Sequence, residues 1–282
     1  MKPRFPIRLL IAALISTLLA GCAPWMTRSD QKQRASMVEY LFPNDKGAKM
    51  TPDARTTLRL PLRVGIAFAP SGDWGGTLAE ADRVRLLGRV KDAFANQPFI
   101  SAIEVIPSSY LLPRGGFANL EQVARMFNVE VIALVSYDQV QFNDANAFSL
   151  LYWTIVGAYV IQGDRYDVNT LLDASVFDVR SRKLLFRAPG VSQIKGSATM
   201  AGFSERSREA RNAGFDKALD NLIPAVNAQL DDFRQRVREG KETSVRVEHS
   251  PGYQGGGDLG GCGAAAALLL LFGLRRARPY AA

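Results

Sequence analysis

Few residues of this 282-residue chain could carry out chemistry. His249 is the only histidine, which excludes a histidine-based triad and a multi-histidine metal site. Six acids leave carboxylate chemistry open, although none belongs to a specific motif: Asp73, Glu80, Asp82, Asp138, Asp144 and Asp164. The loop Gly72 to Gly76 matches neither the dinucleotide fingerprint nor the phosphate-loop lysine pattern, so we interpret it as a turn. The sequence predicts no cofactor and no enzymatic activity, with a carboxylate hydrolase as the alternative.

The first of two cysteines, Cys22, lies where a thiol could be modified at a membrane. Three basic residues precede the apolar run Leu9 to Leu19, which closes on Leu19-Ala20-Gly21-Cys22. These are the parts of a secretory signal peptide, which we predict over residues 1–21 with cleavage between Gly21 and Cys22. A retained anchor is disfavoured, because about 11 apolar residues fall short of the roughly 20 that span a bilayer.

The four residues that end at Cys22 also resemble the bacterial lipoprotein processing box. That resemblance implies a diacylglyceryl group on the Cys22 thiol, further acylation with fatty acids such as palmitate, and a mature chain that begins at Cys22. Ala23 and Pro24 follow where an Asp is absent, which resembles lipoproteins that are passed to the outer membrane of Gram-negative bacteria. An ordinary signal peptide with Cys22 as a bystander is the alternative.

We also interpret the C-terminal segment as membrane-associated. Sixteen uncharged residues, 259–274, would form a helix of roughly 24 Å, slightly short for a bilayer core, and three arginines follow. Two glycine clusters precede or begin this stretch, Gly255-Gly256-Gly257 and Gly260-Gly261. Glycine resists regular helix, so a protease could unwind and grip this backbone. A plain membrane anchor with a glycine hinge is the alternative.

Glycine run, short apolar helix and terminal basic cluster together resemble the GlyGly-CTERM sorting signal that rhombosortase, a rhomboid-type intramembrane serine protease, reads. With the lipoprotein box, the chain resembles the rhombotarget lipoproteins. The resemblance implies that this chain is a protease substrate and that the serine nucleophile belongs to its partner. Because the signal holds two glycine clusters, spacing does not fix the scissile bond, and Cys262 is either removed with the tail or modified.

The net charge of +8 suggests nucleic-acid binding, but its distribution argues against that function. Residues 1–21 and residues 259–282 each carry three Lys or Arg and no acid, so removing both leaves 8 − 3 − 3, about +2. No cysteine lies between Ala23 and Leu259, which excludes a disulfide or a thiolate metal cage within the core. The exported part is therefore a nearly neutral domain without a nucleic-acid partner.

The remaining sequence predicts one α+β domain at residues 55–238, between a spacer at 22–54 with at most a short helix at 37–42 and a flexible linker at 239–258. We expect a mixed sheet with packed helices in the order strand, helix, strand, helix, strand, then a hairpin and a long C-terminal helix. The expected ranges are 62–69, 77–96, 103–106, 120–127, 129–142, the hairpin 168–179 with 184–191, and the helix 205–238.

Apolar positions predict which faces of the helices are buried. In the first helix these are Leu78, Ala81, Val84, Leu87 and Val90, and in the second Val123 and Met126. In the last helix the positions expected toward the core are Ala210, Phe215, Leu219, Leu222, Val226, Leu230 and Phe233, with a kink at Pro224.

Residues 145–163 form a stretch of 19 residues without a charged side chain. Tyr152, Trp153 and Tyr159 have amphipathic rings suited to a bilayer interface or a protein contact. Three interpretations stay open: a core element, a surface that touches lipid or a partner, and a transmembrane span.

Taken together, the sequence predicts a lipid-anchored protein of the Gram-negative cell envelope, at the outer membrane on either its periplasmic or its outer face. Its predicted role is a non-enzymatic binding or assembly module. Its predicted partners are lipoprotein-processing enzymes, a rhombosortase-type protease and membrane lipid, while an envelope protein partner is not identified. Besides the hydrolase, a subunit of an envelope pore is an alternative, since the order of elements resembles the curli-secretion channel subunit.

Overall fold

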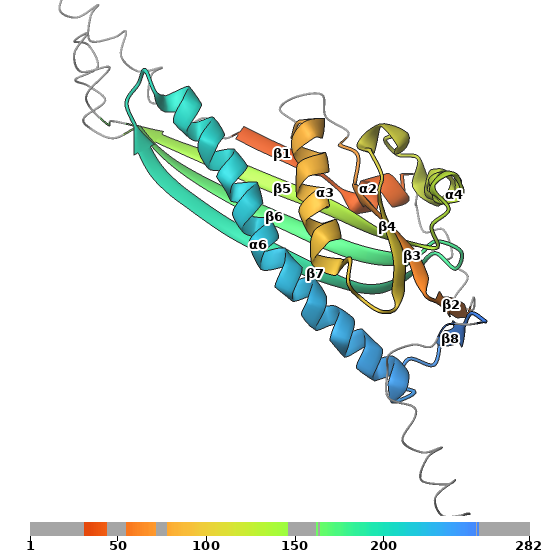
Figure 1. Cartoon of the computed structure of the whole chain (residues 1–282). Helices are drawn as coiled ribbons and strands as arrows, with labels where there is room; N and C mark the ends of the chain where they lie inside the picture. The colour runs from red at the N-terminus through yellow and green to blue at the C-terminus, as the bar shows by residue number, and fades with distance from the viewer. Residues whose placement is uncertain are drawn as a thin grey trace, which may run out of the picture.

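In the computed structural model, a twisted mixed sheet carries helices on both of its faces (Figure 1). The structure describes residues 31–43, 55–71, 78–145, 162, 164–251 and 253. Six of the described strands form the main sheet, in the order β4-β3-β5-β6-β7 with β1 paired to β5, and a separate pair joins β2 to β8. The predicted α+β class with a mixed sheet is confirmed.

The first half of the sheet is parallel, and its strands alternate with helices as predicted. β3 (Leu62–Phe68) pairs in parallel with β4 (Ile100–Val105) on one side and with β5 (Val131–Ala145) on the other. The crossover to β4 contains α3 (Glu80–Phe94), and the crossover to β5 contains α4 (Gly116–Phe127). A parallel pair needs a connection of this length, which a helix supplies while it covers one face of the sheet.

The second half of the sheet is antiparallel. β5 pairs along its whole length with β6 (Asp164–Asp178), which turns into β7 (Lys183–Ala198). The predicted hairpin is confirmed, and both strands extend farther than the apolar pattern indicated. Residues 146–161 and 163, which connect β5 and β6 together with Gln162, include Tyr152, Trp153 and Tyr159 and lie outside the described residues.

One strand of the sheet was not predicted. β1 (Gln31–Ala35) lies within the range expected to be a spacer, yet it pairs antiparallel with β5, with Ala35 opposite Tyr137. It shares the edge of β5 with β3, which pairs farther toward the start of β5. The short helix expected nearby is confirmed as α2 (Met37–Leu41), where the Ser36 hydroxyl accepts a hydrogen bond from the N–H of Glu39 at 3.3 Å.

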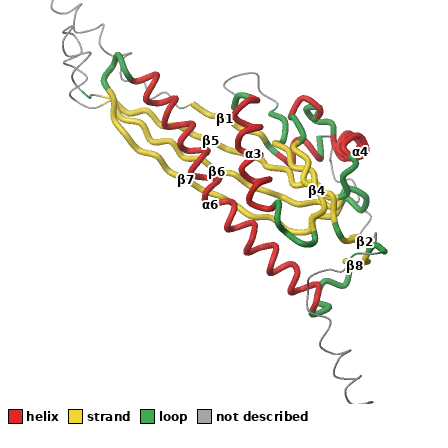
Figure 2. The backbone as a smooth tube through the Cα atoms, viewed as in Figure 1, coloured by secondary structure: helices red, strands yellow, loops and turns green. Residues whose placement is uncertain are grey.

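The sheet has helices on each of its two faces (Figure 2), and neighbouring strand residues pack against opposite helix layers. On one face, Phe68 and Tyr137 pack with side chains of α3 and of α6 (Phe203–Arg238). On the other face, Ala67 and Leu134 pack with α2 and α4. The sheet is thus the middle of three layers, and its central strands are buried on both faces.

The predicted long C-terminal helix is confirmed as α6, and glycine lets its first half approach the sheet closely. A Cβ atom at Gly190 in β7 would lie 2.6 Å from the Cβ and 2.8 Å from the Cα of Leu222. A Cβ atom at Gly214 in α6 would lie 2.6 Å from Oγ1 of Thr170 in β6. The carbonyl of Gly214 accepts a hydrogen bond from the Ser192 hydroxyl at 2.7 Å. Small residues therefore set the distance between helix and sheet at this end.

The range 239–258, expected to be a flexible linker, contains a strand, so that expectation is wrong in part. β8 (Val245–His249) pairs in parallel with β2 (Thr56–Leu60), and Val245 lies opposite Thr56. Glu242, just before β8, accepts a hydrogen bond from the Lys183 ammonium at 2.9 Å, and this bond together with one from Ser244 lowers the pKa of the Glu242 carboxyl. The start of β8 is therefore attached to the start of β7.

Two of the predicted helix stripes are confirmed only in part: Leu87 in α3 and Val123 in α4 are buried as predicted, but Ala81, Val84 and Met126 are exposed. In α3 the side chain of Val84 is 44 % exposed, while Arg83 and Leu86 are buried. In α4 Met126 is 59 % exposed, whereas Leu120 and Val123 are buried. Arg83 replaces an apolar residue in the buried stripe because its guanidinium has partners there, the carbonyl of Leu78 at 3.0 Å and the Ser108 hydroxyl at 2.8 Å. Thr77, where α3 was expected to begin, lies outside the described residues.

We expect the stability of this fold to fall above about pH 10 because of Tyr40. Its buried hydroxyl donates to Oδ1 of Asn119 at 3.0 Å, and desolvation raises the Tyr40 pKa above its ordinary value of 10.0. The folded state then keeps a proton that the unfolded chain loses, so this contribution is complete below pH 10 and declines above it by up to about 1.4 kcal/mol per pH unit.

Chemical unfolding of the full chain at several pH values between 8 and 11 measures this decline. Tyr40→Phe is the control, since Asn119 Oδ1 keeps its second donor, the Leu112 N–H at 2.9 Å. In the variant, the free energy of unfolding should fall less steeply as the pH rises, because the contribution of Tyr40 to this decline is gone. Equal slopes in the two proteins would contradict the assignment.

Candidate functional site

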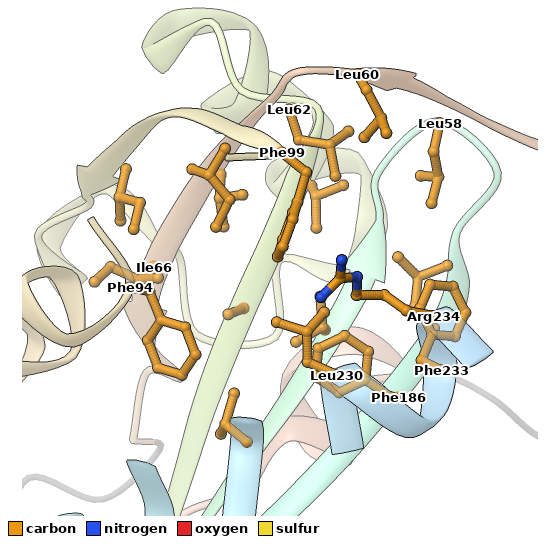
Figure 3. A pocket seen from close by; sticks show the side chains of 18 of the residues that line it. Leu58, Leu60, Leu62, Ile66, Phe94, Phe99, Phe186, Leu230, Phe233 and Arg234 are labelled. Atoms are coloured by element: carbon orange, nitrogen blue, oxygen red, sulfur yellow. The ribbon is translucent and has the colours of Figure 1, made fainter. Parts of the chain in front are cut away.

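A cavity of about 600 Å³ lies between the sheet, α3 and the second half of α6 (Figure 3). Leu222, which packs closely against Gly190 of β7, lines it, and so do residues farther along α6, from Ile223 to Arg238. Its walls come from five strands of the main sheet, from both helices and from the β2–β8 pair. Side chains that shape it include Ile66, Phe94, Ile103, Ala133, Val176, Phe186, Val226, Leu230 and Phe233. This size suits a small organic ligand, since such cavities commonly measure about 300–1,000 Å³.

Nearly all the side chains that line the cavity are apolar, and none of the described lining residues is acidic. The polar exceptions are Arg234, Arg238, His249 and Tyr253. They come from the last turns of α6 and from the segment that starts at β8, so they lie toward one end of the cavity. An apolar cavity with a few polar groups at one end suits a ligand that has one apolar and one polar part.

Arg234 extends from α6 across this end of the cavity toward Phe99 (Figure 3). Its guanidinium carbon lies 4.9 Å from the centroid of the Phe99 ring, within range of a cation–π interaction. One of its terminal nitrogens also contacts the Asp231 carboxylate at 3.3 Å. Since a guanidinium has five N–H donors, this contact leaves donors for a further anion.

The same end of the cavity reaches solvent. Among its lining residues only Pro98, Arg238 and His249 are exposed in the described part of the chain. The ring of His249 stacks on that of Tyr253 with centroids 5.8 Å apart, and the Tyr253 hydroxyl donates to the Pro98 carbonyl at 3.0 Å. These contacts join the segment after β8 to the turn before β4 and so form one rim of the opening.

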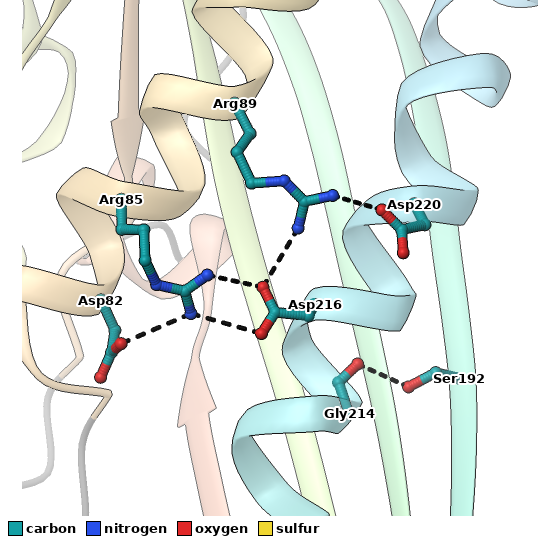
Figure 4. Close-up of polar contacts among 7 residues, drawn as sticks. All are labelled: Asp82, Arg85, Arg89, Ser192, Gly214, Asp216 and Asp220. Carbon is teal, nitrogen blue, oxygen red and sulfur yellow. Dashed lines mark hydrogen bonds and ion pairs between the residues drawn. The ribbon is translucent and has the colours of Figure 1, made fainter.

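Four charged residues connect α3 and α6 (Figure 4). Arg85 contacts Asp216 at 2.7 Å, and Arg89 contacts both Asp216, at 3.1 Å, and Asp220. The hydrogen bond to Asp216 raises the pKa of the Arg85 guanidinium. All four side chains are partly exposed, so each pair adds at most about 1 kcal/mol to stability, and their main effect is to fix the distance between the two helices.

A second recess, more polar, lies at the end of the sheet between α4, the β6–β7 turn and β2, with a volume of about 690 Å³. Its acids include Glu121, Asp178 and Glu248, each of which has a partner. Glu121 contacts Arg182 at 2.7 Å, Asp178 accepts from the Ser181 N–H at 2.7 Å, and Glu248 contacts Arg59 at 3.6 Å. We interpret these contacts as surface ion pairs and a turn that stabilise the fold.

Of the six acids that left a carboxylate hydrolase possible, the five that the structure describes do not come together at either site. Glu80 accepts a hydrogen bond from the Ser108 N–H at 2.9 Å, and Asp82 contacts Arg85 at 3.4 Å. Asp138 is exposed on β5, and Asp144 and Asp164 lie at the opposite end of the β5–β6 pair from the apolar cavity. Asp73 lies outside the described residues, as do residues 72–76 of the glycine-containing loop.

The residues predicted for membrane attachment and processing also lie outside the described residues. They are Gly21, Cys22, Gly255, Gly256, Gly257, Gly260, Gly261 and Cys262. Within the described residues, no helix combines the length and the apolar composition that crossing a membrane requires. Likewise, no group of three or more His, Cys, Asp or Glu in the described residues is arranged to hold a metal ion.

Sequence reasoning missed the cavity, although it identified several of its walls. Val226, Leu230 and Phe233 were predicted to face the core, and they line the cavity together with Arg234. The missing signal is the space between them and the sheet, which periodicity does not report. His249 was placed in a linker, yet the alternation of Val245 and Val247 with charged residues is a strand signal that could have located it.

Comparisons with known proteins place this chain in no family. No family model matches it, and no curated protein matches it. A Helicobacter pylori protein described as a neuraminyllactose-binding hemagglutinin homologue is similar over 69 % of this chain and 96 % of its own, at 8 % identity and a TM-score of 0.37. A Xanthomonas campestris protein of the DUF330 family is similar over 67 % and 97 %, at 13 % identity and a TM-score of 0.30. The PelC dodecamer of Paraburkholderia phytofirmans is similar over 70 % and 98 %, at 10 % identity and a TM-score of 0.22. Likenesses at these scores carry no argument about what this chain binds or does.

Proposed function

We propose that this chain is a lipid-anchored protein of the Gram-negative cell envelope, at the outer membrane, whose globular domain is a non-enzymatic module that binds an apolar ligand. The cavity of about 600 Å³ carries the proposal for the domain, because it is large, mostly apolar and lined by no described acid. A carboxylate hydrolase would need two acids that face each other across a cavity. The binding module needs only the apolar walls and the polar rim.

The proposal for anchoring and processing rests on the residues near the two termini. The segment Leu19-Ala20-Gly21-Cys22 supports acylation of Cys22 by lipoprotein-processing enzymes, with several acyl chains inserted in membrane lipid. The clusters Gly255-Gly256-Gly257 and Gly260-Gly261 support cleavage by a rhombosortase-type protease. In this proposal the chain is processed as a rhombotarget lipoprotein and does no chemistry of its own.

Intact-mass measurement of the full chain tests the proposal for both termini. The protein from a Gram-negative host that has the rhomboid-type protease should begin at an acylated Cys22 and end within or near the glycine clusters. Globomycin, which blocks lipoprotein signal cleavage, should leave residues 1–21 in place, and deletion of the protease should leave the C-terminal arginines in place. A mature chain that still begins at Met1 without the drug would reject the lipoprotein part.

A ligand assay on the same preparation tests the domain separately. An uncharged photoreactive alkyl probe should label peptides from the cavity walls and spare the outward-facing residues of α4, such as Met126. Labelling spread evenly over the surface would contradict a binding cavity and would leave the processing result unaffected.

A further inference from the structure

We infer that the cavity binds a single acyl chain whose anionic head group, a carboxylate or a phosphate, is held by Arg234 and Arg238. This inference rests on the proposed binding function and names its ligand class. The walls of the cavity select the acyl chain, and the arginines at its open end select the head group.

The volume of the cavity fits one chain. A water-sized group occupies roughly 30 Å³ in a liquid, so about 600 Å³ holds on the order of twenty such groups, the size of one long fatty acid. The described lining offers a hydrogen-bonding side chain only at the open end, so a ligand with polar groups along its whole length would bury them without partners. A hydrocarbon chain avoids that cost.

The charges at the open end favour an anion. Arg238 is exposed, and no contact of its side chain with an acid is found among the described residues. Arg234 lies one turn earlier on the same face of α6, so the two guanidinium groups can approach one head group together. Asp231 contacts Arg234 at 3.3 Å but does not line the cavity. Charge-assisted bonds from two arginines are the usual way to hold a carboxylate or a phosphate.

Stacking on Phe99 holds Arg234 where this role needs it. The contact of 4.9 Å keeps the guanidinium over the apolar opening, although a free arginine side chain would extend into water. An anionic head group at Arg234 would place the first carbons of its chain beside Phe99 and Leu230, which Figure 3 shows on either side of the guanidinium.

Photo-crosslinking of the full acylated chain on phosphatidylcholine vesicles tests the inference. The probes are palmitate with a diazirine in its chain and the matching uncharged alcohol. With wild-type protein, palmitate should label peptides of residues 222–238 at a concentration roughly tenfold below that needed for the alcohol. Unlabelled palmitate and lysophosphatidylglycerol compete in parallel, and the stronger competitor identifies the carboxylate or the phosphate as the head group.

Variants separate the two parts of the ligand. The double variant R234Q/R238Q should abolish the preference for palmitate over the alcohol. R238Q alone should reduce this preference with little effect on folding. Arg208→Gln is the matched control, because Arg208 is an exposed arginine of the same helix that does not line the cavity. V226W, which fills the cavity from α6, should reduce labelling by both probes at least fivefold, and a thermal melt verifies that it folds.

Two results would overturn the inference, and they can be told apart. Equal labelling by both probes that the arginine variants leave unchanged would reject the anionic head group but keep an apolar binding site. Labelling by neither probe within the cavity walls, or labelling that V226W leaves unchanged, would reject the binding function as well.

Discussion

Gly190→Val is expected to destabilise the protein by about 3 kcal/mol or more, a large part of the stability of an ordinary domain. A Cβ atom at this position would lie 2.6 Å from the Cβ and 2.8 Å from the Cα of Leu222. Because the second atom belongs to the backbone of α6, a change of rotamer cannot relieve the clash. The helix would have to move away from β7, and the buried packing of Ala218 and Leu222 would be lost.

Chemical unfolding monitored by circular dichroism measures this effect, and Gly88→Val is the matched control. Apart from its chain neighbours and the adjoining backbone of α3, a Cβ atom at Gly88 meets no atom within 4 Å, so the same substitution should change stability by only a few tenths of a kcal/mol. If Gly190→Val were as stable as Gly88→Val, the close approach of α6 to the sheet would be wrong.

Cys22→Ser is expected to abolish acylation entirely and to leave residues 1–21 attached. In the proposed maturation, lipoprotein-processing enzymes modify the Cys22 thiol and cleavage follows this modification. A serine hydroxyl at this position does not replace the thiol. Intact mass is the decisive measurement, because the retained apolar run of about 11 residues could still hold the precursor at a membrane.

Cys262→Ser is the control for this prediction, since it removes the other thiol of the chain and should leave the mass of the mature N-terminus unchanged. If the Cys22→Ser protein were cut normally, Cys22 would be a bystander in an ordinary signal peptide. The contents of the cavity should be the same in both outcomes, because they depend on the folded domain alone.

The strands with strong apolar patterns could be predicted from the sequence, whereas β1 could not. In β3 and in the β6–β7 hairpin, apolar residues at alternate positions predict strands. β1 has the sequence Gln-Lys-Gln-Arg-Ala, in which only Ala35 is buried. It is a strand because the edge of β5 supplies hydrogen-bond partners about a hundred residues away, which no local pattern reports.

The mispredicted positions in α3 and α4 have a related cause. Periodicity assigns a buried position to any apolar residue on the stripe, but Val84 and Met126 face solvent, while Arg83 is buried through its hydrogen bonds to Leu78 and Ser108. The polar partners of a side chain decide such cases, and they come from other elements. The cavity could not be predicted either. Apolar residues such as Val226 and Leu230 fit the helical pattern equally well whether they face a filled core or an open space.

The pairing of β8 with β2 has a consequence for the proposed processing at the C-terminal glycine clusters. The contacts described for the C-terminal segment are made at or before Tyr253, and both glycine clusters come after it. A cut at either cluster therefore leaves the parallel pair and the rim of the cavity intact. The precursor and the trimmed protein should unfold at the same denaturant concentration. Trimming would then change where the molecule is located without changing its fold.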